Sequence, residues 1–290
     1  MADGILNVLK PPGMTSHDVV GYLRRILSTK KIGHAGTLDP DAAGVLPVFV
    51  GQATRLLEYA VDGTKSYRVE MQFGVRTDTG DDSGKAVAFS VVKPLTPATI
   101  QRTLTAFTGT IEQIPPMYSA IKQDGKKLYQ MARAGIDVVR QPRRITIYKL
   151  TLIKQQADGL ILDIECSKGT YIRTLVEDIA IHLGMCGTMS FLLRTQVAGF
   201  KLAEAKTLEE IAATPLAFLQ PTEIGASNLP ELMLTSNQAQ RISQGVLTTV
   251  ENVIDGVYRL KTTTAQFIGI GQATDGKVKA VKIICPFIPL

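Results

Sequence analysis

Residues 33–46 read Gly33-His34-Ala35-Gly36-Thr37-Leu38-Asp39-Pro40-Asp41-Ala42-Ala43-Gly44-Val45-Leu46. The stretch places a histidine and a carboxylate among glycines, whose backbone freedom allows another group to approach closely. Asp39 precedes Pro40, which biases Asp39 away from helical dihedral angles. By itself this spacing favours a helix that begins with Asp39 as N-cap and Pro40 as the first helical residue. We therefore expect a loop that runs into a helix, followed at residues 45–50 by a buried strand or a tight helical turn.

The composition is that of a globular protein long enough for one large and one small domain. The 290 residues are 45% hydrophobic and 20% charged, and the net charge of +6 suits a polyanionic partner without requiring one. Three cysteines without a CxxC pair and three separated histidines favour neither a disulfide framework nor a metal site. No uncharged run has the length of a membrane span and the N-terminus lacks a secretion signal, so we expect a cytoplasmic protein without a bound metal.

Three local patterns predict regular structure around the central stretch. Thr15 followed by Asp18 resembles a capping box at the start of a helix. Residues 66–74 alternate between apolar and polar side chains, as a half-buried strand does. The acidic residues 77–84 are best explained as a hairpin turn before a strand at residues 86–92.

The strongest basic cluster in the chain lies between residues 122 and 144. Its seven members are Lys122, Lys126, Lys127, Arg133, Arg140, Arg143 and Arg144, against two acidic residues. Tyr118 and Tyr129 lie within or beside this segment. Basic side chains that contact phosphates, with aromatic rings nearby, are what a protein that binds a single strand or stem-loop of RNA requires. The alternative is a solvated surface without a ligand.

Several segments together resemble the TruB-type family, the stand-alone bacterial tRNA pseudouridine-55 synthases. Residues 33–46 are similar to the family signature GHxGTLDPxAxGVL, and residues 168–173 match its KGTYIR motif. Residues 77–84 are similar to its TDTxDxxG turn, and residues 7–16 to its opening segment. One such motif alone would be weak, but these occur in the family's order, and the resemblance covers residues 5–215 well.

The resemblance implies an α+β pseudouridine-synthase fold with a mixed, largely antiparallel central sheet, plus a small C-terminal PUA-like β-barrel domain. We expect a catalytic domain in residues 1–225, with a basic RNA-binding insertion at about 117–144, and the PUA-like domain in residues 226–290. The polar, proline-bearing segment near residues 219–230 is the expected linker. A short helix near residues 236–244 and three strands are expected after it.

The activity that the resemblance implies is isomerisation of uridine to pseudouridine at position 55, in the T-arm loop of tRNA, with the target base flipped out. Asp39 matches the family's nucleophile, and a carboxylate can act as covalent nucleophile or base at the sugar or the base ring. Arg173 matches the family's partner of that carboxylate, and we expect the pair to keep Asp39 ionised although burial raises a carboxyl pKa. The alternative for Arg173 is an i,i+4 helix pair with Glu177. Because the reaction has no redox step and no group carrier, no cofactor is expected.

The resemblance also implies the remaining site residues. Tyr67 matches the tyrosine that stacks on the base and serves in the final proton removal, although an ordinary strand aromatic would look the same. Tyr171 and Leu192 match residues of the base pocket, where core packing is the alternative, and His34 matches the residue that replaces the flipped base in the RNA stack. Leu193 stands where the family more often has arginine, which puts one RNA-facing charge in question. The implied basic RNA contacts are Lys122, Lys126, Lys127, Arg133, Arg143 and Arg144.

Two other functions stay open on the sequence. The first is a tRNA-binding or tRNA-folding protein without catalysis, which would use the basic insertion and the C-terminal module. The second is a guide-dependent pseudouridine synthase inside a ribonucleoprotein, as in the family's archaeal and eukaryotic relatives. The basic insertion favours the stand-alone enzyme.

Overall fold

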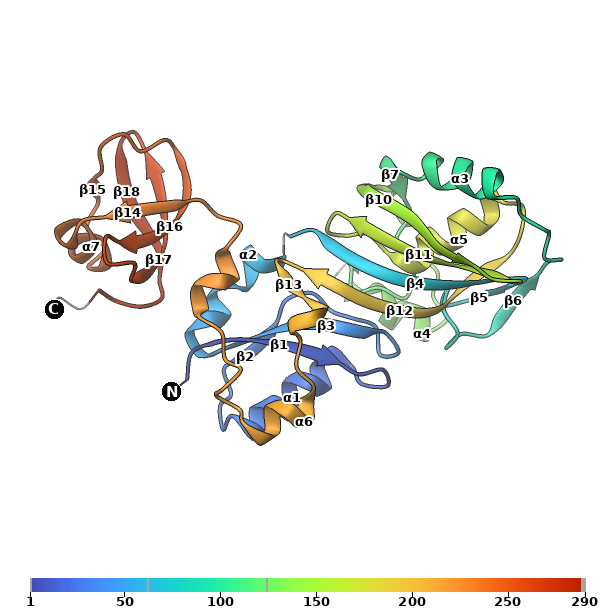
Figure 1. Cartoon of the computed structure of the whole chain (residues 1–290), viewed down its shortest axis with the longest axis horizontal. Coiled ribbons are helices and arrows are strands. Elements are labelled where there is room, and N and C mark those ends of the chain that lie inside the picture. The colour runs from blue at the N-terminus through green and yellow to red at the C-terminus, as the bar shows by residue number, and fades with distance from the viewer. Residues whose placement is uncertain (1, 62, 124, 288–290) are drawn as a thin grey trace.

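The computed structural model describes residues 2–61, 63–123 and 125–287, which form two β-sheets with flanking helices (Figure 1). In this part of the chain nine strands make the large sheet, whose main order is β1-β3-β12-β4-β11-β10-β7, with β2 beside β3 and β13 beside β12. Its strands are β1 (Gly4–Lys10), β2 (Ile32–His34), β3 (Ala43–Val50), β4 (Lys65–Phe73), β7 (Gly109–Gln113), β10 (Arg143–Gln155), β11 (Gly159–Cys166), β12 (Gly187–Val197) and β13 (Phe200–Lys201). β12 runs parallel to β3, and the other described pairs are antiparallel. The expected mixed, largely antiparallel α+β sheet is confirmed.

The elements around the large sheet are short. They are α1 (Ser16–Ile26), α2 (Leu57–Val61), α3 (Pro97–Ala106), α4 (Leu128–Arg133), α5 (Ile172–His182), α6 (Leu208–Ala213), the two-stranded pairs β5 (Val75–Thr77) with β6 (Ala86–Phe89) and β8 (Lys122–Gln123) with β9 (Lys126–Lys127), and the 3-10 turns η1 (Gly51–Leu56), η2 (Leu202–Glu204) and η3 (Thr222–Ala226). α3 and α5 cover the same region of the sheet, where they share a core with β4, β10, β11 and β12 (Figure 1). Within the described residues, helices long and apolar enough for a membrane crossing are lacking.

A second, five-stranded sheet follows toward the C-terminus. Its order is β14-β16-β17-β18-β15, and α7 (Ser236–Ser243) packs beside it. The strands are β14 (Glu231–Leu234), β15 (Thr248–Thr249), β16 (Gly256–Thr262), β17 (Phe267–Thr274) and β18 (Lys277–Ile283). The expected helix and three strands are present, whereas β14 and β15 were not foreseen. β14 joins parallel to β16, a pairing that four residues of sequence do not reveal.

The segment at residues 219–230 connects the two sheets but packs closely on the first. The backbones of Ile5 and Gln220 exchange two hydrogen bonds of 3.0 and 2.8 Å. Ala226 of η3 is buried in an apolar cluster that also contains Phe49 of the large sheet and Phe267 of the second sheet. The two sheets therefore share part of one core.

The local patterns of the sequence correspond closely to the structure. Thr15 and Asp18 form the capping box of α1, and the side chains of β4 alternate between buried and more exposed positions. β5 and β6 form the hairpin around the acidic turn.

The helix expected after Asp39 is wrong. Residues 35–42 form a loop between β2 and β3, and the sequence from Ala43 onward is a strand. The Nζ of Lys10 donates to the carbonyls of Pro40 and Ala42, at 2.8 and 2.7 Å. These carbonyls would accept the first hydrogen bonds of a helix, so their capture by the buried lysine explains why the N-cap signal is overridden.

Replacing Gly44 by alanine should strongly destabilise the fold. Gly44 has a φ of +115°, and a Cβ there would lie 2.2 Å from the carbonyl oxygen of Arg194 on β12. The matched control is Gly13→Ala, where φ is +81° but no atom lies within 4 Å of the added Cβ. We expect a loss of about 1 kcal/mol for Gly13→Ala from backbone strain and about 3 kcal/mol or more for Gly44→Ala, where strain and a backbone clash add. Equal losses in urea unfolding would contradict the close packing of β3 on β12.

Candidate active site

A pocket of about 1240 Å³ lies where segments distant in the sequence meet on the large sheet. Its walls come from the loop at residues 37–42, the acidic turn at 78–85, the segment at 118–133, the start of α5 and the strand β12. The pocket is large enough to hold a nucleoside, and most of its walls are loops fixed to the ends of strands and helices.

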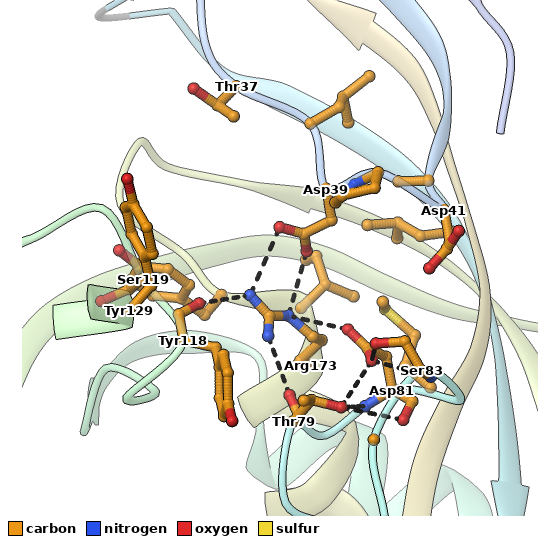
Figure 2. A pocket seen from close by; sticks show the side chains of 18 of the residues that line it. Thr37, Asp39, Asp41, Thr79, Asp81, Ser83, Tyr118, Ser119, Tyr129 and Arg173 are labelled. Carbon is orange, nitrogen blue, oxygen red and sulfur yellow. Dashed lines mark hydrogen bonds and ion pairs between the residues drawn. The ribbon is translucent and has the colours of Figure 1, made fainter. Parts of the chain in front are cut away.

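Arg173 lies at the centre of this pocket (Figure 2). Its Nε is 3.1 Å from Oδ2 of Asp39, and its Nη2 is 3.5 Å from Oδ1, so the guanidinium faces both carboxylate oxygens. It also donates to the carbonyls of Thr79 at 2.9 Å and Tyr118 at 2.8 Å. A second carboxylate, that of Asp81, lies 3.7 Å from Nε. The Arg173 side chain is 7% exposed and that of Asp39 is 39% exposed, so the arginine is fixed while the carboxylate faces the open pocket.

Two influences raise the pKa of Asp39 and two lower it. Burial raises the pKa of the Asp39 carboxyl above its ordinary value, and Asp81 raises it further. The Arg173 guanidinium lowers the pKa, and the Lys10 ammonium does so to a lesser extent. The ion pair therefore counteracts the effect of burial on Asp39 without cancelling it. The alternative partner Glu177 pairs instead with Arg76, at 3.5 Å.

The first turn of α5 holds Arg173 in place. The side chain of Gln113, buried on β7, accepts a hydrogen bond from Tyr171 N at 2.8 Å and donates to Tyr171 O at 3.0 Å. Leu175, Val176 and Ile179 then bury one stripe of the helix in the core. A side-chain amide of β7 thus fixes the backbone of the residue two positions before the arginine, at the start of the helix.

Side chains of Ser16 and Lys10 fix the backbone of the loop that carries Asp39. The Ser16 hydroxyl accepts from Leu38 N at 2.9 Å and donates to Leu38 O at 3.1 Å. Lys10 is fully buried beneath residues 40–42, and desolvation lowers its pKa to about 8. These contacts fix the backbone on both sides of Asp39, so its carboxylate points into the pocket without a helix to support it.

The structure brings eight of the twelve residues singled out from the sequence to one pocket. They are His34, Asp39, Tyr67, Lys127, Arg133, Tyr171, Arg173 and Leu192. Lys127 and Arg133 both lie 5.6 Å from the centre of the Tyr129 ring. The other four, which are Lys122, Lys126, Arg143 and Arg144, are exposed residues outside the pocket lining.

His34 and Tyr67 are largely removed from water in the pocket wall. Burial lowers the pKa of His34, and its Nδ1 is buried without a hydrogen-bond partner. Burial also raises the pKa of Tyr67, which is 7% exposed on β4. Both side chains are therefore neutral near pH 7.

Three residues of this region were not singled out as site residues from the sequence: Lys10, Asp81 and Arg194. Lys10 and Arg194 are fully buried, whereas lysine and arginine are usually exposed. Asp81 is one of several acidic residues in its turn, and only the folded chain shows which of them faces Arg173. These residues could have been identified only by their place in the sequence. Lys10 and Asp81 lie in the motif segments, and Arg194 lies two residues after Leu192. Among the residues placed by the structure, no three His, Cys, Asp or Glu side chains are grouped to hold a metal ion.

Three sequence profiles together match most of the chain. Residues 24–172 match the TruB family pseudouridylate synthase N-terminal domain, and residues 173–226 match the tRNA pseudouridylate synthase B C-terminal domain. Residues 230–284 match a C-terminal domain of pseudouridine synthase II TruB. The chain belongs to the TruB family. The match to this last profile and the separate curled sheet support a PUA-like C-terminal module.

Curated TruB relatives cover almost the full chain. A tRNA pseudouridine synthase B of Caldanaerobacter subterraneus subsp. tengcongensis is 47% identical over 97% of this chain and 99% of its own length. One of Moorella thermoacetica is 48% identical over 85% of this chain and 83% of its own length.

Solved structures agree with this fold. A Cbf5-Nop10-Gar1 complex contains a chain with a TM-score of 0.77 and 24% identity, covering 98% of this chain and 85% of that one. An H/ACA RNP bound to a substrate RNA gives a TM-score of 0.77 at 23% identity, over 98% of this chain and 85% of that one. At these identities the likeness concerns the fold, and it confirms the expected pseudouridine-synthase architecture.

Removing the Arg173 guanidinium should raise the pKa of Asp39 further. Arg173→Met deletes the cation that lowers this pKa, while burial and Asp81 continue to raise it. Arg173→Lys should have a smaller effect because it keeps a positive charge, and Arg76→Met on the outer face is the control. Carboxyl ¹³C chemical shifts against pH, with Asp39 assigned through Asp39→Asn, measure the change. An Asp39 pKa unaltered in Arg173→Met would refute the role of the pair.

Proposed function

We propose that this chain isomerises uridine to pseudouridine at position 55 in the T-arm loop of tRNA, with Asp39 as the nucleophile. The proposal rests on the placement of Asp39. Its carboxylate faces an open pocket and is paired with the buried guanidinium of Arg173. Relatives named tRNA pseudouridine synthase B, 47% identical over nearly the whole chain, support the same reaction and substrate.

The reaction is an internal rearrangement of the nucleoside. The glycosidic bond from C1′ to N1 breaks, the base turns, and a new bond joins C1′ to C5. The hydrogen on C5 is lost and N1 gains one, so the product has the composition of the substrate and no redox partner is needed. Asp39 provides the nucleophilic carboxylate at the sugar or the base, and Tyr67 takes the C5 proton in its ionised phenolate form, becoming a phenol.

The ion pair has two effects that help this chemistry. Arg173 favours the ionised form of Asp39 that a nucleophile requires, and its two carbonyl contacts hold it in one orientation. Asp81 contacts the same guanidinium and helps to hold it in place, although its own charge raises the pKa of Asp39. The Asp39 carboxylate is thus held by a fixed partner, which agrees with the need for preorganised groups at a reacting centre.

The rim of the pocket has the groups that an RNA loop requires. Lys127 and Arg133 are cations of the pocket lining, half-buried and exposed respectively, and each lies 5.6 Å from the centre of the Tyr129 ring. A uridine within a folded loop is reached only if it is flipped out, at a cost of about a few kcal/mol that pocket contacts offset. His34 and Leu192 line the space that a flipped base would enter. Lys122, Lys126, Arg143 and Arg144 extend the basic surface beyond the pocket.

The proposed organisation follows from this site. Residues 1–225 form the catalytic domain, with the RNA-binding insertion at about 117–144, and residues 226–290 form the PUA-like domain. The tRNA substrate places the activity in the cytoplasm. The alternatives are a tRNA-binding protein without turnover and an enzyme that needs a guide RNA. Neither alternative predicts that the chain converts uridine in tRNA when no guide RNA is present, whereas this proposal does.

The catalytic role of Asp39 is tested by Asp39→Asn. The variant removes the nucleophile but keeps the shape of the side chain, so we expect tritium release from 5-tritiated uridine in tRNA to fall about 10⁴-fold or more. Binding of tRNA should persist. Asp163→Asn, an exposed carboxylate paired with Arg68, is the control that should keep full activity. Equal tritium release by Asp39→Asn and wild type would refute the proposed chemistry.

The basic rim is tested by the salt dependence of tRNA binding. Each cation that contacts a phosphate contributes about one to the slope of log affinity against log salt. The double variant Lys127→Ala/Arg133→Ala should weaken binding and reduce this slope by about two. Lys154→Ala, near the far end of β10, should leave it unchanged. An unchanged slope in the double variant would show that these side chains do not contact the RNA.

A further inference from the structure

Arg194 is a fully buried arginine next to the pocket that the chemistry described above does not use. It is 0% exposed and lies on β12, two residues after Leu192, so the two side chains share one face of the strand. Leu192 lines the pocket. Arg194 therefore lies beside Leu192 but is covered, outside the pocket lining.

The guanidinium joins three separate segments of the site. Its Nε donates to the carbonyl of Val45 on β3 at 2.8 Å, and its Nη2 donates to the carbonyl of Gly36 in the loop before Asp39 at 2.9 Å. Tyr67 is the residue opposite Arg194 in the β4–β12 register, so the two buried side chains lie side by side on one face of the sheet. Arg194 thus ties the loop before Asp39 to β3 and β12, and it lies next to the Tyr67 ring.

The charge of Arg194 has no carboxylate partner among the residues that the structure describes. The titratable groups near it are Tyr67, Lys10, His34 and the buried Lys65, which lies with Arg194 beside Gly36, and none of these is an anion near pH 7. Burying a guanidinium without a counter-ion is costly. Two backbone carbonyls account for part of the guanidinium's hydrogen bonding, and its positive charge is left facing Tyr67.

The position of Tyr67 next to Arg194 indicates the role of this charge. A guanidinium carries a positive charge and offers only hydrogen-bond donors, so a neighbouring phenol oxygen can interact with it only as an acceptor. Arg194 therefore favours the negative form of the Tyr67 oxygen. Tyr67 faces opposing influences, because burial, Cys166 and Asp39 all favour its neutral form.

We propose that Arg194 is a positioning residue that holds the Tyr67 oxygen at the pocket wall and compensates its negative charge when it acts as the base. This inference rests on the proposed function. In the step concerned, the C5–H bond of the rearranged base breaks and its proton joins the Tyr67 phenolate, which becomes a phenol. The electron pair of that bond restores the C5–C6 double bond, the electrons of the C6–N1 double bond move to N1, and N1 takes a proton from water.

The direct test is the ionisation of Tyr67, which requires no catalytic activity. Tyrosine labelled with ¹³C at Cζ reports the phenol and phenolate by NMR, and Tyr67→Phe assigns the signal among the eight tyrosines. We expect Tyr67 to ionise at higher pH in Arg194→Met than in wild type, with Arg194→Lys in between. Arg68→Met, on the next residue of β4, is the matched control and should leave the titration unchanged. Equal Tyr67 titrations in wild type and both Arg194 variants would overturn the proposal.

Kinetics distinguish this role from a purely structural one. At pH 7 we expect kcat on tRNA to fall about tenfold or more in Arg194→Met and to recover partly at higher pH. Each unit by which the pKa of the phenol rises leaves about tenfold less phenolate at a given pH below that pKa. KM should change little. In a Tyr67→Phe background, adding Arg194→Met should not lower kcat any further. An equal loss at every pH and in both backgrounds would overturn the proposal. If wild type itself shows no activity, the proposed function fails, while the NMR titration still decides whether Arg194 controls Tyr67.

Discussion

The contact between Arg173 and Asp39 is the interaction on which the rest of the site depends. A carboxylate desolvated by a pocket tends to take up a proton, and then it can no longer act as a nucleophile. A guanidinium on its buried side opposes this, provided that the guanidinium itself is immobile. Two carbonyls and a second carboxylate meet that condition in this protein. The helix start that bears Arg173 is in turn fixed by the side chain of Gln113.

This arrangement requires a fold that joins distant parts of the chain. The partners of Arg173 lie 134, 94 and 55 residues away, at Asp39, Thr79 and Tyr118. β12 lies between β3 and β4, so it places the loop before β3 beside the tyrosine of β4. The same strand carries Leu192 into the pocket and Arg194 behind it. The mixed sheet thus acts as a rigid base for the pocket: Tyr67 lies on the central strand β4, Asp39 lies in the loop before β3, and Arg173 lies in the first turn of α5.

Much of this could be predicted from the sequence, and the failures have physical causes. Asp39, Tyr67 and Arg173 were found through motif resemblance, and the strand around Tyr67 through alternation. The local rule for Asp39 and Pro40 predicted a helix and was wrong, because a buried lysine 30 residues earlier takes the loop carbonyls. Arg194 was not singled out because arginine is normally exposed, and its burial depends on three segments meeting. Four of the six basic residues expected to contact RNA lie outside the pocket. Charge counting identifies a basic segment but not the direction of each side chain.

The central claim is that this chain alone carries out the isomerisation through one arginine-held carboxylate. The most direct measurement is to incubate the purified protein with an unmodified tRNA transcript, without guide RNA or protein partner, and to map pseudouridine at single-nucleotide resolution. We predict conversion of one uridine in the T-arm loop, at position 55. A transcript that is bound but unconverted, or converted only after a guide RNA is added, would contradict the account.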